Sequence, residues 1–536
     1  MSQLISLCRA VLNEHFGSVV GQVGEVLLKE SAQFGILVFR LKDKVSLAQI
    51  RKALAILEQH NLVSFELVNA QRIVYKVNPW DVLMLLKIPR CGLIIKTLYQ
   101  DVAESIYEEI IKEGRMTLSD TLRKMKERNP SLSFEEARSK FETLAKAEFI
   151  IREPPIDCYI KGCPIFAQKF EQFEVPAVTE AKVYLSEPPA NRKRKAESGD
   201  SDAGIYWKIN WMRFERYIRD ELILDQIVGS KTNSPRDQLF RGTITALLKA
   251  CETRATTIFA LETVPVSLYD IIKTANDEKI ATIEKGNAAF VLSTIIDESN
   301  GVLRKIGESG GGLYVIDYGR GMQLLAQSHI ESLIREQLDT KAVRIFRLLQ
   351  RTGYLEEEQI EKLIMLNPKE TRELLYAMNE ENYVFVQPLG KTSDFAPART
   401  FYLYRTDFNR TVRLVEESTC KFLLNLMLRR EHEEKEHRAL LDRNEKMEAI
   451  IAENVDNNEE LDEAARSQQR AEIEQIYMND ADRTLLGRHK NAKKKLMGSE
   501  IEIERVLYLL HTHLVFAERA IPMKKRGRTR KPLIIA

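Results

Sequence analysis

A glycine-rich stretch with the letters GESGGGLYVI, Gly307 to Ile316, is the clearest place where residue types alone suggest chemistry. A phosphate-binding loop turns its backbone N–H groups toward the ligand at the start of a helix, and a lysine follows it. Here apolar residues typical of a strand follow, and no Gly-Lys-Ser/Thr follows the glycines. Glycine also supplies the positive φ of a hairpin turn. The stretch therefore predicts a hairpin, or wing, that turns at Gly310, Gly311 and Gly312.

The cysteines and histidines offer few arrangements that would hold a metal ion. Of the six cysteines only Cys158 and Cys163 are close in sequence, and this pair alone cannot fill a tetrahedral zinc site. Among the eight histidines, His432 and His437 are spaced i, i+5, which places their rings on different sides of a helix. Reduced thiols and isolated histidines are expected, and the sequence predicts no metal and no cofactor.

Catalytic motifs are also missing. His-Glu-x-x-His does not occur in the sequence, and the letters Gly-x-Ser-x-Gly at 307–311 lie in the expected hairpin turn rather than in the strand-to-helix turn of a nucleophile elbow. The carboxylates are distributed through Glu- and Lys-rich segments, which is typical of solvated helix surfaces rather than of a paired acid and base. The prediction is a protein without active-site residues, and an enzyme is the weakest of the functional hypotheses.

Length and composition indicate a modular helical protein. A chain of 536 residues has room for roughly three to five domains. Apolar residues make up 44% and charged residues 29%, a mixture that fits several small cores. The formal net charge is +2, so a nucleic-acid partner would need a local basic surface. The longest apolar runs are too short for a membrane span, which predicts an intracellular chain without a membrane partner.

A pattern of helix, strand, turn and strand recurs along the chain and is typical of a winged helix. The first occurrence begins at a capping box, Ser46 to Gln49, and ends with strands around the turn at Asn69 to Arg72. Ser133 to Glu136 is predicted to be a second capping box. The third occurrence contains the glycine-rich hairpin. In the fourth, Asn367 and Pro368 give an N-cap and an N1 proline before the last helix.

The predicted fold class is therefore mainly α with small β-hairpins, built from tandem extended winged-helix domains and a C-terminal antiparallel coiled coil. The coiled coil is expected because apolar stripes on either side of Asn454 to Asn458 have helical spacing. The expected parts are winged helices at 1–79, 80–187, 205–326 and 327–410, a mobile basic linker at 188–204, a coiled-coil hairpin at 411–520 and a basic tail at 521–536.

Basic residues on the predicted helices can reach phosphates or base edges, as in helix-turn-helix proteins, or can simply cover an exposed helix face. Winged helices also serve as protein-protein adaptors, and the sequence leaves open which of them faces nucleic acid. The candidates for nucleic-acid contact are Arg51, Lys52, Arg138, Lys140, Lys146, Arg344 and Arg347. Two clusters are candidates for nuclear import or electrostatic DNA contact, namely Arg192, Lys193, Arg194 and Lys195, and Lys524, Lys525 and Arg526.

Several strings of residues resemble, in order and spacing, one family of transcription proteins. They are HNLVSF (60–65), KTLY (96–99), GIYW (204–207), SGGGLYVI (309–316), VRIFRLLQ (343–350) and APARTFYLY (396–404). The family is the large subunit of the RNA polymerase III-specific heterotrimeric initiation subcomplex, similar to the alpha subunit of TFIIE. The resemblance extends from the first helix to the predicted coiled coil.

The resemblance implies four extended winged helices and a C-terminal coiled coil. It also implies a nuclear, non-catalytic subunit that sits on the polymerase III clamp, binds the two smaller heterotrimer subunits, and assists promoter recruitment and DNA opening. The linker at 188–204 is shorter than the insertion of some relatives, and the resemblance implies no function for the basic tail. A free-standing winged-helix regulator that reads DNA is the alternative.

Overall fold

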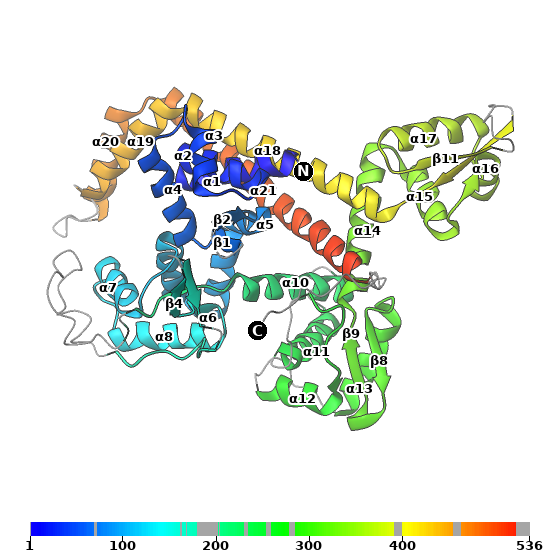
Figure 1. Ribbon diagram of the computed structural model, residues 1–536, viewed down its shortest axis with the longest axis horizontal. Coiled ribbons are helices and arrows are strands. Elements are labelled where there is room, and N and C mark those ends of the chain that lie inside the picture. Colours follow the sequence, from blue (N-terminus) through cyan, green and yellow to red (C-terminus); the bar gives the residue numbers. More distant parts are fainter. Residues whose placement is uncertain are drawn as a thin grey trace. The chain divides into compact units, whose positions relative to one another are not determined.

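The computed structural model divides the chain into two compact units. Unit 1 contains residues 1–210 and 417–506, and unit 2 contains residues 211–416 and 507–536. Both units are mainly helical with short antiparallel strands (Figure 1). None of the described helices is long and apolar enough to cross a membrane. The structure describes residues 2–68, 72–160, 163–167, 169–178, 202, 204–229, 234–252, 259–277, 285–390, 399–453 and 463–520.

Unit 1 opens with a helical domain that ends in a two-stranded wing. Ser46 accepts a hydrogen bond from the backbone of Gln49, whose side chain accepts one from Ser46 N–H, which confirms the first capping box. Ile50 and Leu57 are fully buried on the inner face of the helix that follows. The turn predicted at 69–72 lies largely outside the described residues. The elements are α1 (Ser2–Phe16), α2 (Ser18–Lys29), α3 (Phe34–Leu41), α4 (Leu47–Gln59), β1 (Val63–Val68) and β2 (Arg72–Val77).

The next helices of unit 1 are completed by a strand that lies far along the chain. The strand β6 (Trp207–Ile209) pairs antiparallel with β3 (Ile150–Arg152). Trp207 is fully buried, and its ring meets Phe141 edge to face with centroids 5.2 Å apart. The other elements are α5 (Pro79–Leu83), η1 (Met84–Lys87), α6 (Ile88–Glu113), α7 (Leu118–Arg128), α8 (Phe134–Lys146), β4 (Ile156–Ile160) and β5 (Cys163–Phe166).

Two expectations for this region need correction. The third domain was expected to begin at residue 205, whereas β6 belongs to unit 1, because its apolar side chains fill the core against β3 and α8. Ser133 precedes α8 but makes no capping hydrogen bond through its side chain. The second capping box is therefore absent. The cysteines whose side chains are described, including Cys158, are unpaired thiols.

The first domain of unit 2 contains the glycine-rich hairpin. The strand β8 (Leu303–Gly307) pairs antiparallel with β9 (Leu313–Ile316), and the φ angles of Gly310, Gly311 and Gly312 are 63°, 84° and 119°. A Cβ at Gly312 would lie 3.0 Å from the Tyr314 ring. Both the conformation and the space therefore require glycine there. The other elements are α10 (Trp211–Val228), α11 (Pro235–Glu252), β7 (Val266–Ser267), α12 (Leu268–Asp277), α13 (Lys285–Glu298) and η3 (Ser309–Gly311).

The second domain of unit 2 repeats the scheme of helices followed by a hairpin. Pro368 occupies the first turn of its last helix, after Asn367 at the N-cap. The central strand of its sheet pairs antiparallel with both of its neighbours. The elements are α14 (Tyr318–Gln337), α15 (Thr340–Thr352), β10 (Leu355–Glu356), α16 (Glu357–Ile364), α17 (Pro368–Glu380), β11 (Phe385–Gly390) and β12 (Thr400–Arg405).

The C-terminal helices run antiparallel within unit 1, as their ion pairs demonstrate. Partner numbers fall as residue numbers rise, from Arg430–Glu500 (2.9 Å) through Glu434–Lys493 (2.8 Å) to Arg443–Asp482 (3.2 Å). The helices do not form a unit of their own at 411–520, because packing divides them between the two units. The predicted interruption at 454–458 lies outside the described residues. The elements are α18 (Phe408–Glu436), α19 (Arg438–Ile451), α20 (Glu463–Tyr477) and α21 (Asp480–Ala520).

Loss of the Phe141 ring is expected to destabilise unit 1 strongly. Phe141→Ala removes the edge-to-face contact with Trp207 and leaves a cavity, at a cost of about 3–5 kcal/mol. Phe39→Ala is the matched control, because the Phe39 side chain is 81% exposed, and it should change stability by less than about 0.5 kcal/mol. Urea unfolding followed by tryptophan fluorescence measures both effects. Equal shifts in the two variants would contradict a central role for this contact.

A buried histidine in unit 2 is expected to make stability fall in mild acid. His513 donates from Nε2 to Asn409 Oδ1 at 3.2 Å, and burial lowers its pKa to about 4. In the unfolded chain the His513 imidazole is protonated near pH 6.5, whereas in the folded chain it stays neutral down to about pH 4. The free energy of unfolding is therefore highest above pH 6.5 and falls by about 3 kcal/mol between pH 6.5 and 4. His513→Gln should remove this dependence of stability on pH. His432→Gln, at an exposed site, should retain it. Thermal melts across this pH range provide the measurement.

Candidate nucleic-acid and protein interfaces

The basic residues of α4 lie on its exposed face. Ile50 and Leu54 turn inward, which leaves Arg51 and Lys52 toward solvent. The Arg51 guanidinium lies 5.7 Å from the centre of the Phe34 ring, while Lys52 has no acidic partner in the described part of the chain. Glu58, at the far end of the helix, pairs with an arginine outside it at 3.0 Å. The first half of α4 is therefore a basic surface free to meet an anion.

The basic residues of α8 are largely committed to the fold. Arg138 donates to Glu142 and to the carbonyl of Val178, each at 3.1 Å. Lys140 donates to the carbonyl of Tyr99 at 3.3 Å, at a break in α6 where Gln100 has a φ of 75°. It thus satisfies a carbonyl that helix bonding leaves open. Of the three candidates on α8, only Lys146 is exposed without an ion pair among the described residues.

The candidates on α15 are also engaged within the protein. Arg344 donates to the carbonyl of Ile364 at 2.9 Å, at the C-terminal end of α16. Arg347 forms an ion pair with Glu331 of α14. Burial alone would raise the pKa of Glu331, but its hydrogen bonds from Arg347 and Gln327 outweigh burial and lower that pKa. Both arginines therefore join helices of one domain, and Arg347 also has an acidic partner.

Large apolar side chains on α16, at its C-cap and on α17 are exposed, and no motif in the sequence marks them. The exposed fractions are 89% for Met365, 58% for Leu363 and 73% for Tyr376. Tyr376 follows the fully buried Leu375, so helical periodicity places it on the outer face of α17. Periodicity does not show whether that face binds a partner. The acidic Glu373 is exposed on the same helix. This surface is apolar and weakly acidic, which suits a protein partner better than DNA.

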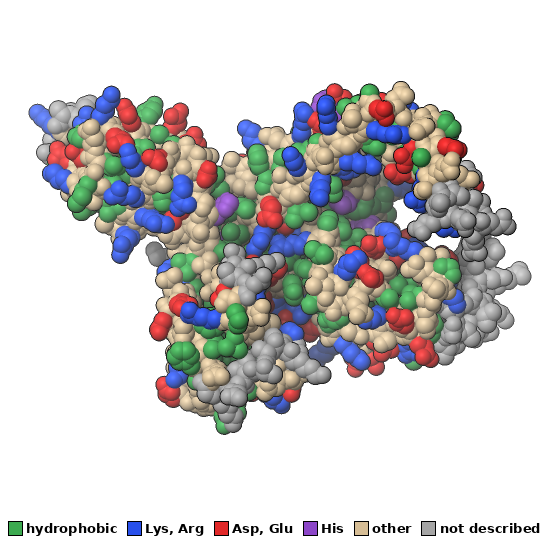
Figure 2. Space-filling model, turned by 180° about the vertical axis from the view of Figure 1, so that it is seen from behind, with side chains coloured by type: hydrophobic (Ala, Val, Ile, Leu, Met, Phe, Trp, Pro, Cys, Tyr) green, Lys and Arg blue, Asp and Glu red, His purple; other side chains and the backbone are tan. Residues whose placement is uncertain are grey.

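Charges of both signs are mixed on one face of the molecule. On the face shown in Figure 2, Lys and Arg side chains are interspersed with Asp and Glu over most of the molecule. This face therefore carries no broad patch of one charge among the described residues. The basic clusters at 192–195 and 524–526 lie outside the described residues.

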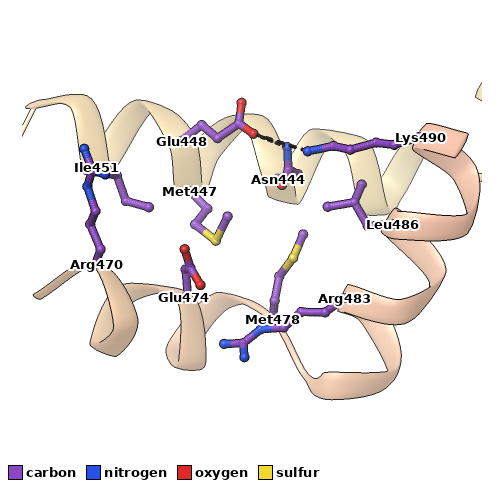
Figure 3. Close-up of a pocket in the computed structure, with 11 residues that line it drawn as sticks. Asn444, Met447, Glu448, Ile451, Arg470, Glu474, Met478, Arg483, Leu486 and Lys490 are labelled. Carbon is purple, nitrogen blue, oxygen red and sulfur yellow. Dashed lines mark hydrogen bonds and ion pairs between the residues drawn. The ribbon is translucent and has the colours of Figure 1, made fainter. Parts of the chain in front are cut away.

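A cavity of about 540 Å³ opens between α19, α20 and α21 in unit 1. Figure 3 shows Met447 and Met478 pointing toward each other across it. At its rim Glu448 accepts a hydrogen bond from Asn444 at 2.8 Å and lies 3.8 Å from Lys490. Methionine adapts its shape readily, so an apolar floor with a charged rim is suited to a partner's side chain. The sequence identified the apolar stripe but not the cavity.

Two clusters of titratable residues form only in the folded chain. Arg219 and Asp220 make a buried ion pair at 2.7 Å beneath the Tyr318 ring, beside a cavity of about 60 Å³. Such a cavity is far smaller than a substrate site. In unit 1, His437 and His489, predicted to be isolated, lie with ring centres 5.2 Å apart. The i, i+5 argument considered only His432 and His437 and missed a partner from a distant helix.

Comparison with known proteins decides the family. Residues 330–406 match the C-terminal winged-helix domain of POLR3C, and residues 6–67 match the helix-turn-helix domain of RNA polymerase III subunit RPC82. DNA-directed RNA polymerase III subunit RPC3 from Mus musculus is 30% identical over 95% of this chain and 98% of its own length. The chain belongs to the RPC3 family. The human and zebrafish RPC3 proteins are each 29% identical, over 95% and 96% of this chain.

Membership of the RPC3 family agrees with the sequence-based identification and makes the chain a subunit of RNA polymerase III. Its role is accessory rather than catalytic. The two family models fall on α1 to β1 of unit 1 and on α14 to β12 of unit 2. The surfaces of α4, α16 and α17 thus lie in two winged-helix domains of an RPC3 protein, and their contrasting chemistry distinguishes these domains.

Charge reversal on α4 is expected to weaken binding of the full chain to duplex DNA. Arg51→Glu with Lys52→Glu should reduce the slope of log affinity against log salt by about 2, because two phosphate contacts are lost. The control is Lys362→Glu with Lys369→Glu, whose exposed side chains lie on α16 and α17. Fluorescence anisotropy at several salt concentrations measures the slopes. An equal loss in both pairs would mean that only overall charge matters.

Proposed function

We propose that this chain docks on the clamp of RNA polymerase III, holds two smaller subunits of a heterotrimer, and assists promoter recruitment and DNA opening for small-RNA gene transcription. The observation that carries the proposal is the match to RPC3 relatives over nearly the whole of both chains. Nuclear localisation follows from this assignment. The basic run from Arg192 to Lys195 has the composition of an import signal.

The winged helix of α14 to β12 is proposed to face protein. Met365, Leu363 and Tyr376 leave a large apolar area in water, and such side chains anchor protein-protein interfaces when a partner covers them. The basic residues of α17 provide little attraction for DNA. Arg372 pairs with Glu357, and Glu370 of the same helix pairs with Lys341.

The winged helix of α1 to β2 is proposed to contact promoter DNA through α4. Arg51 and Lys52 are adjacent, exposed and uncompensated on their helix, which is the arrangement that binds phosphates. Two charges give modest affinity. The contact therefore serves a subunit that the polymerase already holds near DNA, where the effective concentration is high.

The cavity between α19, α20 and α21 is proposed to receive an apolar side chain from one of the smaller subunits. Its floor of Met447, Met478 and Leu486 is apolar, and Arg483 and Glu474 at its edge offer polar contacts of both signs (Figure 3). A side chain of leucine or phenylalanine size would be buried there, and burial of this kind stabilises a complex.

Affinity purification tests the assembly. Tagged full-length chain, recovered from nuclear extract at high salt, should bring down a near-stoichiometric RNA polymerase III with two smaller subunits. Met365→Asn with Tyr376→Ser should lower recovery of a partner about tenfold, equivalent to roughly 1.4 kcal/mol. Asparagine is chosen because Met365 has a φ of 58°, which asparagine tolerates.

Lys369→Ser is the control for this experiment. Its side chain is 86% exposed on α17, and its loss should leave recovery unchanged. Recovery of the wild-type chain alone, or with chromatin proteins that salt removes, would contradict the polymerase assignment and favour the free-standing DNA-binding regulator. Recovery of the polymerase with all variants would leave the assignment intact but reject α16 and α17 as the docking surface.

A further inference from the structure

Three side chains with metal-binding atoms converge in unit 1. Glu433 lies near the end of α18, His437 follows that helix, and His489 is on α21. One potential ligand atom of each residue lies within 4.8 Å of the other two. His437 has φ and ψ of −101° and 14° at the junction of α18 and α19, four residues after Glu433. Their side chains therefore share one side of the chain, facing α21.

His489 has an unmet requirement for a polar partner. It is 3% exposed, and neither Nδ1 nor Nε2 has a hydrogen-bond partner. A neutral imidazole carries one donor and one acceptor, and leaving a buried polar group unsatisfied costs about 1–3 kcal/mol. The ring of His437 meets it at 68°, so the contact between the rings does not satisfy its nitrogens. A bound metal ion is a partner to which an imidazole nitrogen can donate its lone pair.

We propose that Glu433, His437 and His489 bind a divalent transition-metal ion, with Zn²⁺ the ion that this ligand set favours. Imidazole and carboxylate are ordinary Zn²⁺ ligands, and two histidines with one carboxylate leave a fourth tetrahedral position for water. Zinc–ligand distances near 2 Å place ligand atoms roughly 3 Å apart around the ion, so the side chains need only small rotations from a separation within 4.8 Å.

The neighbouring charges support a fixed carboxylate at this site. Arg429 forms an ion pair with Oε1 of Glu433, one turn earlier on α18, and the Glu433 side chain is only 16% exposed. An outer partner of this kind orients a metal-binding carboxylate. Lys493 of α21 pairs with the neighbouring Glu434 at 2.8 Å. The ion would join the α18–α19 junction to α21 and so fasten two antiparallel segments.

Metal titration of the full-length chain tests the proposal. The protein is stripped with a chelator, and Zn²⁺ is added in competition with a chromophoric chelator, with Co²⁺ used to report tetrahedral geometry by its visible absorption. One equivalent should bind, and Zn²⁺ should raise the melting temperature. His489→Gln and His437→Gln should each weaken Zn²⁺ binding by at least ~10-fold. Loss of a residue that only hydrogen-bonds to a metal ligand already has an effect of that size. His432→Gln is the control, because His432 lies on α18, ahead of His437, and its side chain is 64% exposed.

Two results would overturn the metal site. One is the absence of stoichiometric binding by the wild-type chain. The other is binding by both His437→Gln and His489→Gln with the wild-type affinity, which would assign the metal to other thiols and histidines. Circular dichroism establishes whether each variant is folded. If His489→Gln fails to fold, the less buried His437 provides the decisive variant.

Discussion

The arrangement of unit 1 depends on one arginine that joins three distant segments of the chain. Arg430 of α18 lies 2.9 Å from Glu500 of α21 and 3.0 Å from Glu14 of α1, and its side chain is 15% exposed. Burial opposes its charge, but the two carboxylates outweigh burial and raise its pKa. Removing both carboxylates would leave this largely buried charge without compensation, at a cost of about 3–5 kcal/mol. The first winged helix is therefore fixed to the C-terminal helices by electrostatics as well as by apolar packing.

A second buried ion pair also joins the C-terminal helices to the N-terminal part of unit 1. Lys87 of η1 and Glu504 of α21 are each 7% exposed on their side chains and lie 3.9 Å apart. Together with Arg430 it holds α21 against elements from the first hundred residues. A long helix held only by apolar contacts can rotate or slide on its neighbours. Buried ion pairs form in one register of the helix only, because each charge must meet its partner. We infer that these pairs specify how unit 1 is assembled.

The winged helices of this chain share a local pattern but differ in what they leave exposed. On α4 the outer face carries Arg51 and Lys52, whereas on α17 it carries Tyr376 and acidic residues. A repeated fold thus offers several surfaces of distinct chemistry to one large assembly. This division agrees with the proposal that the subunit contacts both protein and nucleic acid, and it requires no broad basic surface on the chain as a whole.

The sequence by itself determined the helices, the wings and the family, because these depend on local periodicity, caps, glycines and ordered strings of residues. The hairpin at Gly310 to Gly312 and the capping box at Ser46 are examples, since each is specified by a few neighbouring residues. The sequence also assigned basic residues to helices correctly. It did not indicate that Lys140 would satisfy a carbonyl of α6 or that Arg347 would pair with α14.

Only the tertiary structure decided which of these charges are free and which distant groups meet. Periodicity gives the side of a helix on which a residue lies, but not which other element covers that side. The pairing of Trp207 with the second domain, the cavity beside Met447 and the approach of His437 to His489 all join segments separated along the chain. Such contacts form when apolar surfaces are buried together, so they are properties of the packed chain rather than of any local stretch.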